Sequence, residues 1–224
     1  MKINIAIDGP SAAGKSTIAK KLAEKLNYVH LDTGAMYRCT AMKALKTGID
    51  LEDEKALCAM LADTQITLTP QGSVYLDGED VTSSIRKDEI SLAASSVSRH
   101  PGVRKDLVNR QKQMAEDGGF IMDGRDIGTV VLPDAKVKVF MTASAQARAR
   151  RRYDQNMAEG IPSESLEEIT QEIMQRDYQD THRRASPLTK AADAVEIDTS
   201  DMTIEQVCKA IYDLAQPFVS KEEE

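Results

Sequence analysis

The chain carries a phosphate-binding pattern near its N-terminus, in which two glycines are separated by four residues and followed by a lysine and a hydroxyl side chain. The pattern reads Gly9-Pro10-Ser11-Ala12-Ala13-Gly14-Lys15-Ser16 and continues into Thr17. In such a loop the backbone N–H groups surround phosphate oxygens, the lysine reaches the β- and γ-phosphates, and the hydroxyl ligates Mg²⁺. We therefore expect residues 9–17 to bind a nucleoside triphosphate, with Lys15 acting on its outer phosphates and Ser16 on the metal.

The sequence around this loop has the context that the pattern requires. Ile5 and Ile7 alternate with other residues as in a short buried strand, and Ile18 and Leu22 recur at helical spacing after the loop. A helix that begins at the loop adds the positive end of its dipole to the phosphate site. The alternative is a chance turn of small residues with an exposed lysine, which needs neither a strand before it nor a helix after it.

A second polar segment, Asp32-Thr33-Gly34-Ala35-Met36-Tyr37-Arg38, follows a strand predicted over 28–31. Because ligands of open α/β sheets bind at the carboxyl ends of strands, this segment is expected at the same edge of the sheet as the phosphate loop. Arg38 is suited to hold a phosphate through two parallel hydrogen bonds. The alternative is a solvated charge on a helix.

A third polar segment, Asp123-Gly124-Arg125-Asp126, follows a short apolar strand predicted over 120–122. Arg125 and Asp126 offer hydrogen-bond donors and acceptors at one point. An aspartate that accepts from an exocyclic amino group, with an arginine donating nearby, matches the edge of cytosine. The alternative is a turn that ends the strand and contains a local salt bridge.

Arginines gather in the last third of the chain, in Arg148-Ala149-Arg150-Arg151-Arg152 and at Arg176, Arg183 and Arg184. Arg148, Arg151 and Arg152 share one face of the helix predicted over 145–157. Phosphoryl transfer spreads negative charge over the transferred oxygens, so a mobile arginine-rich lid would stabilise that charge and exclude water on closing. The alternatives are a solvated helix face and a nucleic-acid patch, which the few aromatic residues disfavour.

Strands and helices alternate along most of the chain, which predicts a parallel sheet covered by helices on both faces. Further strands are predicted over 137–141 and 194–197, and further helices over 36–45, 52–62, 88–97, 103–115 and 166–178. The last helix follows Asp201, with Thr203 and Gln206 at capping-box spacing. A frayed tail is expected over 220–224.

The pattern changes between residues 65 and 81, where apolar residues alternate with polar ones. Turns fall at Pro70-Gln71-Gly72 and at Asp77-Gly78, which is typical of β-hairpins. We therefore expect a small antiparallel sheet inserted into the parallel architecture.

The composition is that of a globular protein, with 41% hydrophobic and 29% charged residues in 224. A net charge of −7 disfavours a general nucleic-acid or membrane surface. Apolar runs are too short to span a bilayer and the N-terminus lacks the apolar stretch of a secretory signal, so we expect a cytoplasmic protein. Cys39, Cys58 and Cys208 lie far apart, which predicts free thiols rather than a zinc site.

Four stretches spread over nearly the whole chain resemble the cytidylate kinases of bacteria, a family of the nucleoside monophosphate kinase group. They are residues 7–16, residues 31–38, residues 123–131, and Arg176-Asp177 together with Arg183 and Ser186-Pro187-Leu188. The hairpin region near 65–100 also resembles the enlarged monophosphate-binding insert that distinguishes this family from adenylate kinases.

The resemblance implies an α/β fold of the P-loop type, in which a parallel five-stranded sheet is flanked by helices in one domain over 1–224. Within it, a monophosphate-binding region would span 33–104 with its insert at 64–102, and a short helical lid with the following helix would span 148–186. The implied reaction transfers the γ-phosphoryl group of ATP to CMP or dCMP, with Mg²⁺ as cofactor.

The resemblance also implies a role for each site residue. The cytosine would be read by Ser95, Arg104 and Asp126, the sugar by Arg176 and Asp180, and the phosphate by Arg38, Arg125 and Arg183. Thr33 belongs to the same pocket and stands where many relatives have serine, so the hydroxyl is kept. The catalytic cations would be Lys15, Arg125, Arg148, Arg152 and Arg183.

Two other functions remain open from the sequence. A UMP or UMP/CMP kinase is the nearest, although UMP presents an acceptor where CMP presents an amino donor, which is a poorer match to Asp126. A nucleotide sensor that binds ATP without turnover is the other, although it needs no second phosphate pocket. We expect ATP and a small monophosphate as partners, neither nucleic acid nor a membrane, and a monomer.

Overall fold

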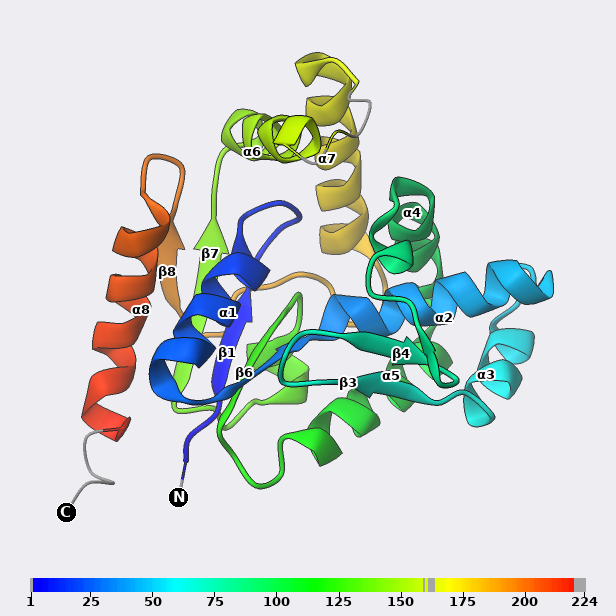
Figure 1. The fold of residues 1–224 in the computed structure, drawn as a ribbon, viewed down its shortest axis with the longest axis horizontal. Coiled ribbons are helices and arrows are strands. Elements are labelled where there is room, and N and C mark those ends of the chain that lie inside the picture. The colour runs from blue at the N-terminus through cyan, green and yellow to red at the C-terminus, as the bar shows by residue number, and fades with distance from the viewer. Residues whose placement is uncertain (1, 159, 161–163, 220–224) are drawn as a thin grey trace.

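The computed structural model describes residues 2–158, 160 and 164–219. Its centre is a five-stranded sheet, beside which lies a separate three-stranded sheet (Figure 1). Helices α6 (Ala145–Ala158) and α7 (Leu166–His182) lie at the edge where the central strands end.

The central sheet has the strand order β2-β6-β1-β7-β8, and every neighbouring pair in it is parallel. The strands are β1 (Ile5–Asp8), β2 (Val29–Asp32), β6 (Phe120–Gly124), β7 (Val137–Thr142) and β8 (Val195–Asp198). This confirms the predicted parallel five-stranded sheet. Because β2, β6 and β1 are neighbours, the three polar segments that follow them meet at one edge.

The two faces of the sheet belong to different hydrophobic clusters, as the period of two along a strand requires. Ile5 and Ile7 face α1 (Lys15–Leu26) and α8 (Ile204–Val219), where they share a cluster with Leu22 and Ile211. Ala6 lies in the other cluster, together with side chains of α2 (Thr33–Thr47) and α5 (Pro101–Met114). Both clusters exclude water from the sheet, so the strand ends that carry the site are rigidly held.

The small sheet consists of β3 (Ile66–Leu68), β4 (Val74–Leu76) and β5 (Glu79–Asp80), all antiparallel. It confirms the predicted hairpins. The 3₁₀ turn η1 (Ser84–Arg86) and helix α4 (Asp88–Val97) follow it, and α3 (Glu54–Ala62) precedes it. Its buried side chains belong to the same cluster as those of α2 and α5, so the inserted sheet shares a core with the rest of the chain.

Several elements differ from the sequence prediction for local reasons. Helix α2 begins at Thr33, three residues earlier than predicted, because the Asp32 carboxylate accepts the N–H of Ala35 at 3.0 Å. Helix α7 continues four residues beyond Tyr178. A five-residue π-helix, η2 (Ile127–Val131), was not predicted at all.

The predicted capping box of α8 is confirmed. The Thr203 N–H donates to Oε1 of Gln206 at 2.8 Å, and the Gln206 N–H donates to Oγ1 of Thr203 at 3.2 Å. Within the described part of the chain, none of the helices is both long enough and apolar enough to cross a bilayer. The predicted frayed tail over 220–224 lies outside the described residues.

Candidate active site

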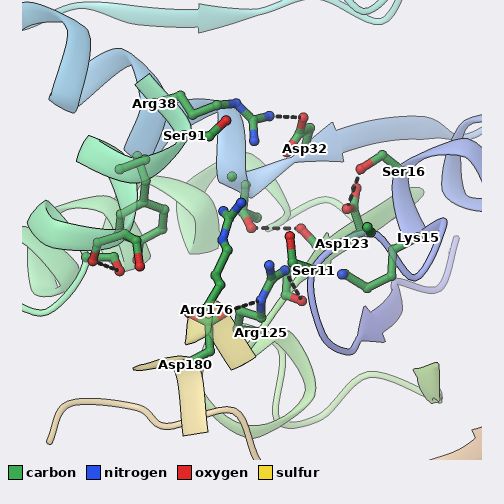
Figure 2. Close-up of a pocket in the computed structure, with 18 of the residues that line it drawn as sticks. Ser11, Lys15, Ser16, Asp32, Arg38, Ser91, Asp123, Arg125, Arg176 and Asp180 are labelled. Atoms are coloured by element: carbon green, nitrogen blue, oxygen red, sulfur yellow. Dashed lines mark hydrogen bonds and ion pairs between the residues drawn. The ribbon is translucent and has the colours of Figure 1, made fainter. Parts of the chain in front are cut away.

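A cavity of about 580 Å³ opens where the strands of the central sheet end. The loops after β1, β2 and β6 line it, together with α4 and the C-terminal half of α7 (Figure 2). The sequence-predicted residues that line it are Ser11, Ala12, Ala13, Gly14, Lys15, Ser16, Thr17, Thr33, Arg38, Ser95, Arg104, Arg125, Asp126, Arg152, Arg176, Asp180 and Arg183. The fold therefore brings most of the predicted donor and acceptor residues into one space.

Gly9 and Pro10 belong to the phosphate-loop pattern but do not line the cavity. A Cβ atom on Gly9 would lie 2.1 Å from the carbonyl oxygen of Met141, so only glycine lets the chain leave β1 this close to β7. The carbonyl oxygen of Pro10 accepts a hydrogen bond from Nζ of Lys15 at 2.7 Å. Both residues therefore fix the conformation of the loop without lining the cavity.

The Lys15 ammonium is held inside the site, with only 6% of the residue exposed. Its pKa is lowered to about 7, chiefly by burial and next by the positive charge of Arg125. Negative phosphate oxygens close to this lysine would favour the protonated form. Lys15 is thus placed to gain charge as an anion binds.

Asp123 is a site residue that the sequence analysis did not single out. It is near the end of β6, where its Oδ2 accepts from Oγ of Ser16 at 2.8 Å (Figure 2). Its Oδ1 lies 2.7 Å from Nε2 of His30. Burial alone would lower the pKa of His30, but the hydrogen bond and charge of Asp123 raise it. Only the strand order brings Asp123 beside the phosphate loop.

Two ion pairs lie among the residues that line the cavity. Arg38 binds Asp32 at 2.6 Å, and Nε of Arg125 binds Oδ2 of Asp180 at 2.6 Å (Figure 2). Burial would raise the pKa values of both carboxyl groups, but the facing arginines hold them below their usual range. Each arginine keeps further N–H donors for a ligand.

A third, more deeply buried pair that lines the cavity joins Arg104 and Asp126. Each residue is only 4% exposed. The Arg104 guanidinium lies 5.3 Å from the ring centroid of Tyr37, and burial raises the pKa of that phenol to about 12. The pair presents a fixed acceptor beside a fixed donor, and the aromatic ring supports the donor.

Positive charges crowd the space between these groups and the phosphate loop. Burial lowers the pKa of Arg176 to about 10, and the nearby charges of Arg125, Arg38 and Arg152 contribute to the same shift. Such repulsion raises the free energy of the site, and a bound polyanion would offset it. The electrostatics therefore favour ligands with several negative charges.

Two predicted hydroxyl contacts already have partners in the fold. Oγ1 of Thr33 donates to the carbonyl oxygen of Asp123 at 2.7 Å. Oγ of Ser95 donates to Oε1 of Gln179 at 3.0 Å, which ties α4 to α7. Both hydroxyl oxygens still have acceptor capacity toward a ligand.

Arg148 was predicted among the catalytic cations, but it does not line the cavity. Its guanidinium donates to the carbonyl oxygens of Ser11 and Ala143 and to the carboxylate of Asp177. It therefore joins the phosphate loop to α6, in the predicted lid, and to α7, the helix that follows it. The three arginines that were predicted to share one helix face have different partners. Arg148 binds the phosphate loop, Arg151 binds the backbone of Thr199, and Arg152 lines the cavity.

A second cavity of about 360 Å³ adjoins the first along the phosphate loop. Apolar side chains form much of its wall, from α1, β7 and α8 and the segment before α8. These are Ile18, Met141, Met202, Ile204 and Val207. An apolar slot beside a phosphate loop suits a flat aromatic group joined to phosphates.

Among the described residues, no three histidine, cysteine or carboxylate side chains converge as a metal site would require. Cys39, Cys58 and Cys208 are free thiols, as predicted. A divalent cation here would depend on one or two protein oxygens together with ligand phosphates, which is the usual arrangement for Mg²⁺.

Comparisons with known proteins agree with these features. The cytidylate kinase family model matches residues 5–217. Curated cytidylate kinases of Geobacillus thermodenitrificans and Geobacillus kaustophilus are 53% and 52% identical, each over 95% of this chain and 96% of its own length. Among solved structures, a gluconokinase from Sinorhizobium meliloti superposes with a TM-score of 0.51 at 14% identity, over 97% of this chain and 95% of that one. This last similarity concerns the fold alone.

Proposed function

Because the chain belongs to the cytidylate kinase family, we propose that it transfers the γ-phosphoryl group of ATP to CMP or dCMP, giving ADP and CDP or dCDP. The observation that carries the proposal is the layout of the large cavity. The phosphate loop and the buried Arg104–Asp126 pair both line it. Such a cavity lets a donor triphosphate and an acceptor monophosphate meet inside one protein.

The acceptor base is cytosine in this proposal. The Asp126 carboxylate accepts from the exocyclic amino group, and Arg104 donates to a ring acceptor. Uracil presents an acceptor where cytosine has the amino donor, so it would face the carboxylate with no hydrogen to share. This argument favours CMP over the UMP alternative, and Ser95 is proposed to complete the contact with the base.

The sugar and phosphate of the acceptor occupy the arginine-rich middle of the cavity. We assign the phosphate to Arg38, Arg125 and Arg183, and the sugar to Arg176 and Asp180, with Thr33 beside them. The depressed pKa of Arg176 supports an anion at this place, because an anion would relieve the repulsion from Arg125. A sensor that binds only ATP would not need this second group of arginines, so their presence argues against that alternative.

The donor triphosphate lies on residues 9–17, and the apolar second cavity takes its base. Four residues of the loop line both cavities, which supports this assignment. They are Ala12, Ala13, Gly14 and Thr17. The phosphates then point from the second cavity toward the acceptor pocket. The nucleotides would meet close to Lys15.

The chemistry needs no general base. The acceptor is a phosphate monoester with a second pKa of about 6, so near neutral pH it is largely a dianion and already a nucleophile. The enzyme must instead align two polyanions and offset the charge of the transferred group. We assign this task to Lys15, Arg125, Arg152 and Arg183. Arg148 contributes indirectly, because it holds the phosphate loop through the carbonyl oxygen of Ser11.

Oxygen atoms of Ser16 and Asp123 fit a divalent cation. A hydroxyl and a carboxylate already lie 2.8 Å apart beside the phosphate loop, and Mg²⁺ prefers oxygen ligands. When bound with ATP, Mg²⁺ neutralises charge on the β- and γ-phosphates. Ser16 and Asp123 would hold it, and His30 would fix the orientation of the Asp123 carboxylate.

The domain organisation is part of the same proposal. Residues 33–104 form the acceptor-binding region with its insert at 64–102, and residues 148–186 form the lid with its following helix. We propose that the enzyme acts as a monomer in the cytoplasm, since the donor and acceptor groups invoked here all come from one chain.

The Asp126→Asn variant tests the acceptor assignment. An amide can donate to the exocyclic oxygen of uracil, so the ratio of kcat/KM for CMP to that for UMP should fall at least about tenfold, from the loss of one charged hydrogen bond. The KM for ATP should change by less than about threefold. The exposed Asp134, on the same stretch of chain, gives a control in Asp134→Asn, which should leave both values unchanged. An unchanged ratio in Asp126→Asn would remove Asp126 from base recognition.

A further inference from the structure

A buried carboxylate outside the assigned site connects the phosphate loop to the acceptor pocket. Asp8 is the last residue of β1 and directly precedes Gly9. It is 4% exposed, and its Oδ1 and Oδ2 accept the backbone N–H groups of Ile127 and Gly128, both at 2.7 Å. The partners are 119 and 120 residues away in the sequence, so these bonds fix tertiary structure rather than a local turn.

The two N–H donors follow directly after the residue proposed to read the base. Asp126 leads into η2, and its carbonyl oxygen accepts from the N–H of Val130 at 2.9 Å. Its side chain pairs with Arg104 in the buried acceptor pocket. The Asp8 carboxylate therefore anchors the backbone at the point from which the Asp126 side chain projects.

The packing around this anchor is tight. A Cβ atom on Gly128 would lie 3.3 Å from Oδ2 of Asp8 and 3.3 Å from Cδ of Lys138. The Lys138 side chain is itself held by Asp193 and by the carbonyl oxygen of Pro133. Gly128 thus lies between a fixed carboxylate and a fixed aliphatic chain, and the segment has little room to shift.

We propose that Asp8 is a positioning residue for acceptor recognition, which holds residues 126–128 so that the Asp126 carboxylate meets the base and Arg104 in register. The proposal rests on the proposed function, because it concerns how the acceptor pocket of that reaction is held. It adds a residue that touches neither nucleotide.

The donor side has its own supports. Lys15 donates to the carbonyl oxygen of Pro10, Arg148 donates to that of Ser11, and Gly9 lies against Met141. Loss of the Asp8 anchor should therefore loosen the acceptor pocket more than the phosphate loop. This asymmetry separates a positioning role from a general loss of structure.

The substitution Asp8→Asn tests the anchor with little change in volume. The amide oxygen of asparagine can still accept one N–H. The amide NH₂ group is itself a donor, so it cannot accept the second N–H. One lost bond to a buried donor predicts a KM for CMP about tenfold higher, with the KM for ATP within about twofold of wild type. Asp213 supplies a control outside the binding regions, since it pairs with Lys209 on the exposed face of α8, and Asp213→Asn should change neither KM.

A double-mutant cycle distinguishes action through Asp126 from an independent effect. If Asp8 acts through Asp126, CMP should bind Asp8→Asn/Asp126→Asn about as well as Asp126→Asn alone. Additive losses in CMP affinity, or equal rises in the KM values for CMP and ATP, would overturn the proposal. So would a folded Asp8→Asn enzyme with an unchanged KM for CMP.

A second variant decides the matter if Asp8→Asn does not fold. Gly128→Ala keeps the carboxylate but inserts a methyl group against it, and should also raise the KM for CMP selectively. An unchanged KM for CMP there would overturn the proposal. The wild-type enzyme in the same assays tests the proposed function separately, because absence of CMP turnover in wild type contradicts that function whatever the variants do.

Discussion

At the scale of single residues, the site depends on buried ionisable groups whose pKa values are shifted by burial and by neighbouring charges. Lys15 and Arg176 have lowered pKa values, whereas Asp180 is stabilised as a carboxylate by Arg125. Burial is the largest cause of the two lowered pKa values, and the positive charges of neighbouring arginines add to it. Binding energy from the phosphates can then offset the repulsion, which gives selectivity for polyanions.

The buried carboxyl of Asp8 links the stability of the fold to pH. Burial raises its pKa from 3.8 to about 6, against the opposing effect of the Gly128 and Ile127 hydrogen bonds; the charge of Asp126 raises it and that of Lys15 lowers it. Between about pH 4 and pH 6 the folded protein therefore holds a proton that the unfolded chain has released. The contribution of Asp8 to the free energy of unfolding therefore falls as the pH rises through this window.

We therefore predict a pH-dependent difference between wild type and Asp8→Asn. The free energy of unfolding of wild type, minus that of the variant, should fall by about 2 kcal/mol from pH 4 to pH 7, because one pKa unit corresponds to about 1.4 kcal/mol and the unfolded carboxyl is already largely ionised at pH 4. Urea unfolding followed by circular dichroism at several pH values measures this difference. If the difference in unfolding free energy stays constant or rises with pH, the pKa of the Asp8 carboxyl is not raised in the folded protein.

At the scale of elements, α6 and α7 are joined to the phosphate loop by one buried arginine. Arg148 bonds to Asp177 of α7 at 2.6 Å and to the carbonyl oxygen of Ser11 at 3.1 Å. A small cluster of Ala149, Ile169 and Ile173 packs beside it. The same α7 carries Arg176 and Asp180, so this junction sets where the acceptor-side charges lie relative to the loop.

The Asp177→Asn variant should destabilise the protein by about 2–3 kcal/mol, because it leaves the buried Arg148 without its charged partner. Helix α6 provides the matched control. Arg150 and Asp154 form an ion pair at 3.0 Å whose side chains are 65% and 56% exposed. Asp154→Asn should cost less than about 1 kcal/mol. Equal losses for the two variants in urea unfolding would argue against the junction.

Elements were predictable from the sequence where the signal is local. The strand before Gly9, the hairpins near Asp77-Gly78 and the Thr203–Gln206 capping box each follow from neighbouring residues, and each is present. The early start of α2 depends on the Asp32 side chain, which the apolar pattern does not reveal. The first two N–H groups of the π-helix at 127–131 donate to the distant Asp8 carboxylate, a contact that no local pattern marks.

At the scale of the whole molecule, the strand order determines which polar segments form the site. The phosphate loop, Arg38 and Asp126 could be predicted as candidates because each follows a predicted strand. The partnership of Ser16 with Asp123 could not be predicted from the spacing, since it needs β6 beside β1. The inward turn of Arg148 was missed for a similar reason, because its partner Asp177 lies on another helix.

The phosphate loop, Lys15 and the arginines line one cavity. We propose that its parts hold a donor and an acceptor nucleotide, so that the γ-phosphoryl group of ATP moves to a cytidine monophosphate.

Transfer of label from [γ-³²P]ATP tests this claim directly. The purified full chain is incubated with Mg²⁺ and with CMP, dCMP, UMP or AMP in turn, and the labelled products are separated by chromatography. We predict labelled CDP and dCDP, transfer to UMP and AMP at less than about a tenth of that rate, and loss of transfer when a chelator removes Mg²⁺. No labelled diphosphate from CMP, or faster labelling of AMP or UMP than of CMP, would contradict the account.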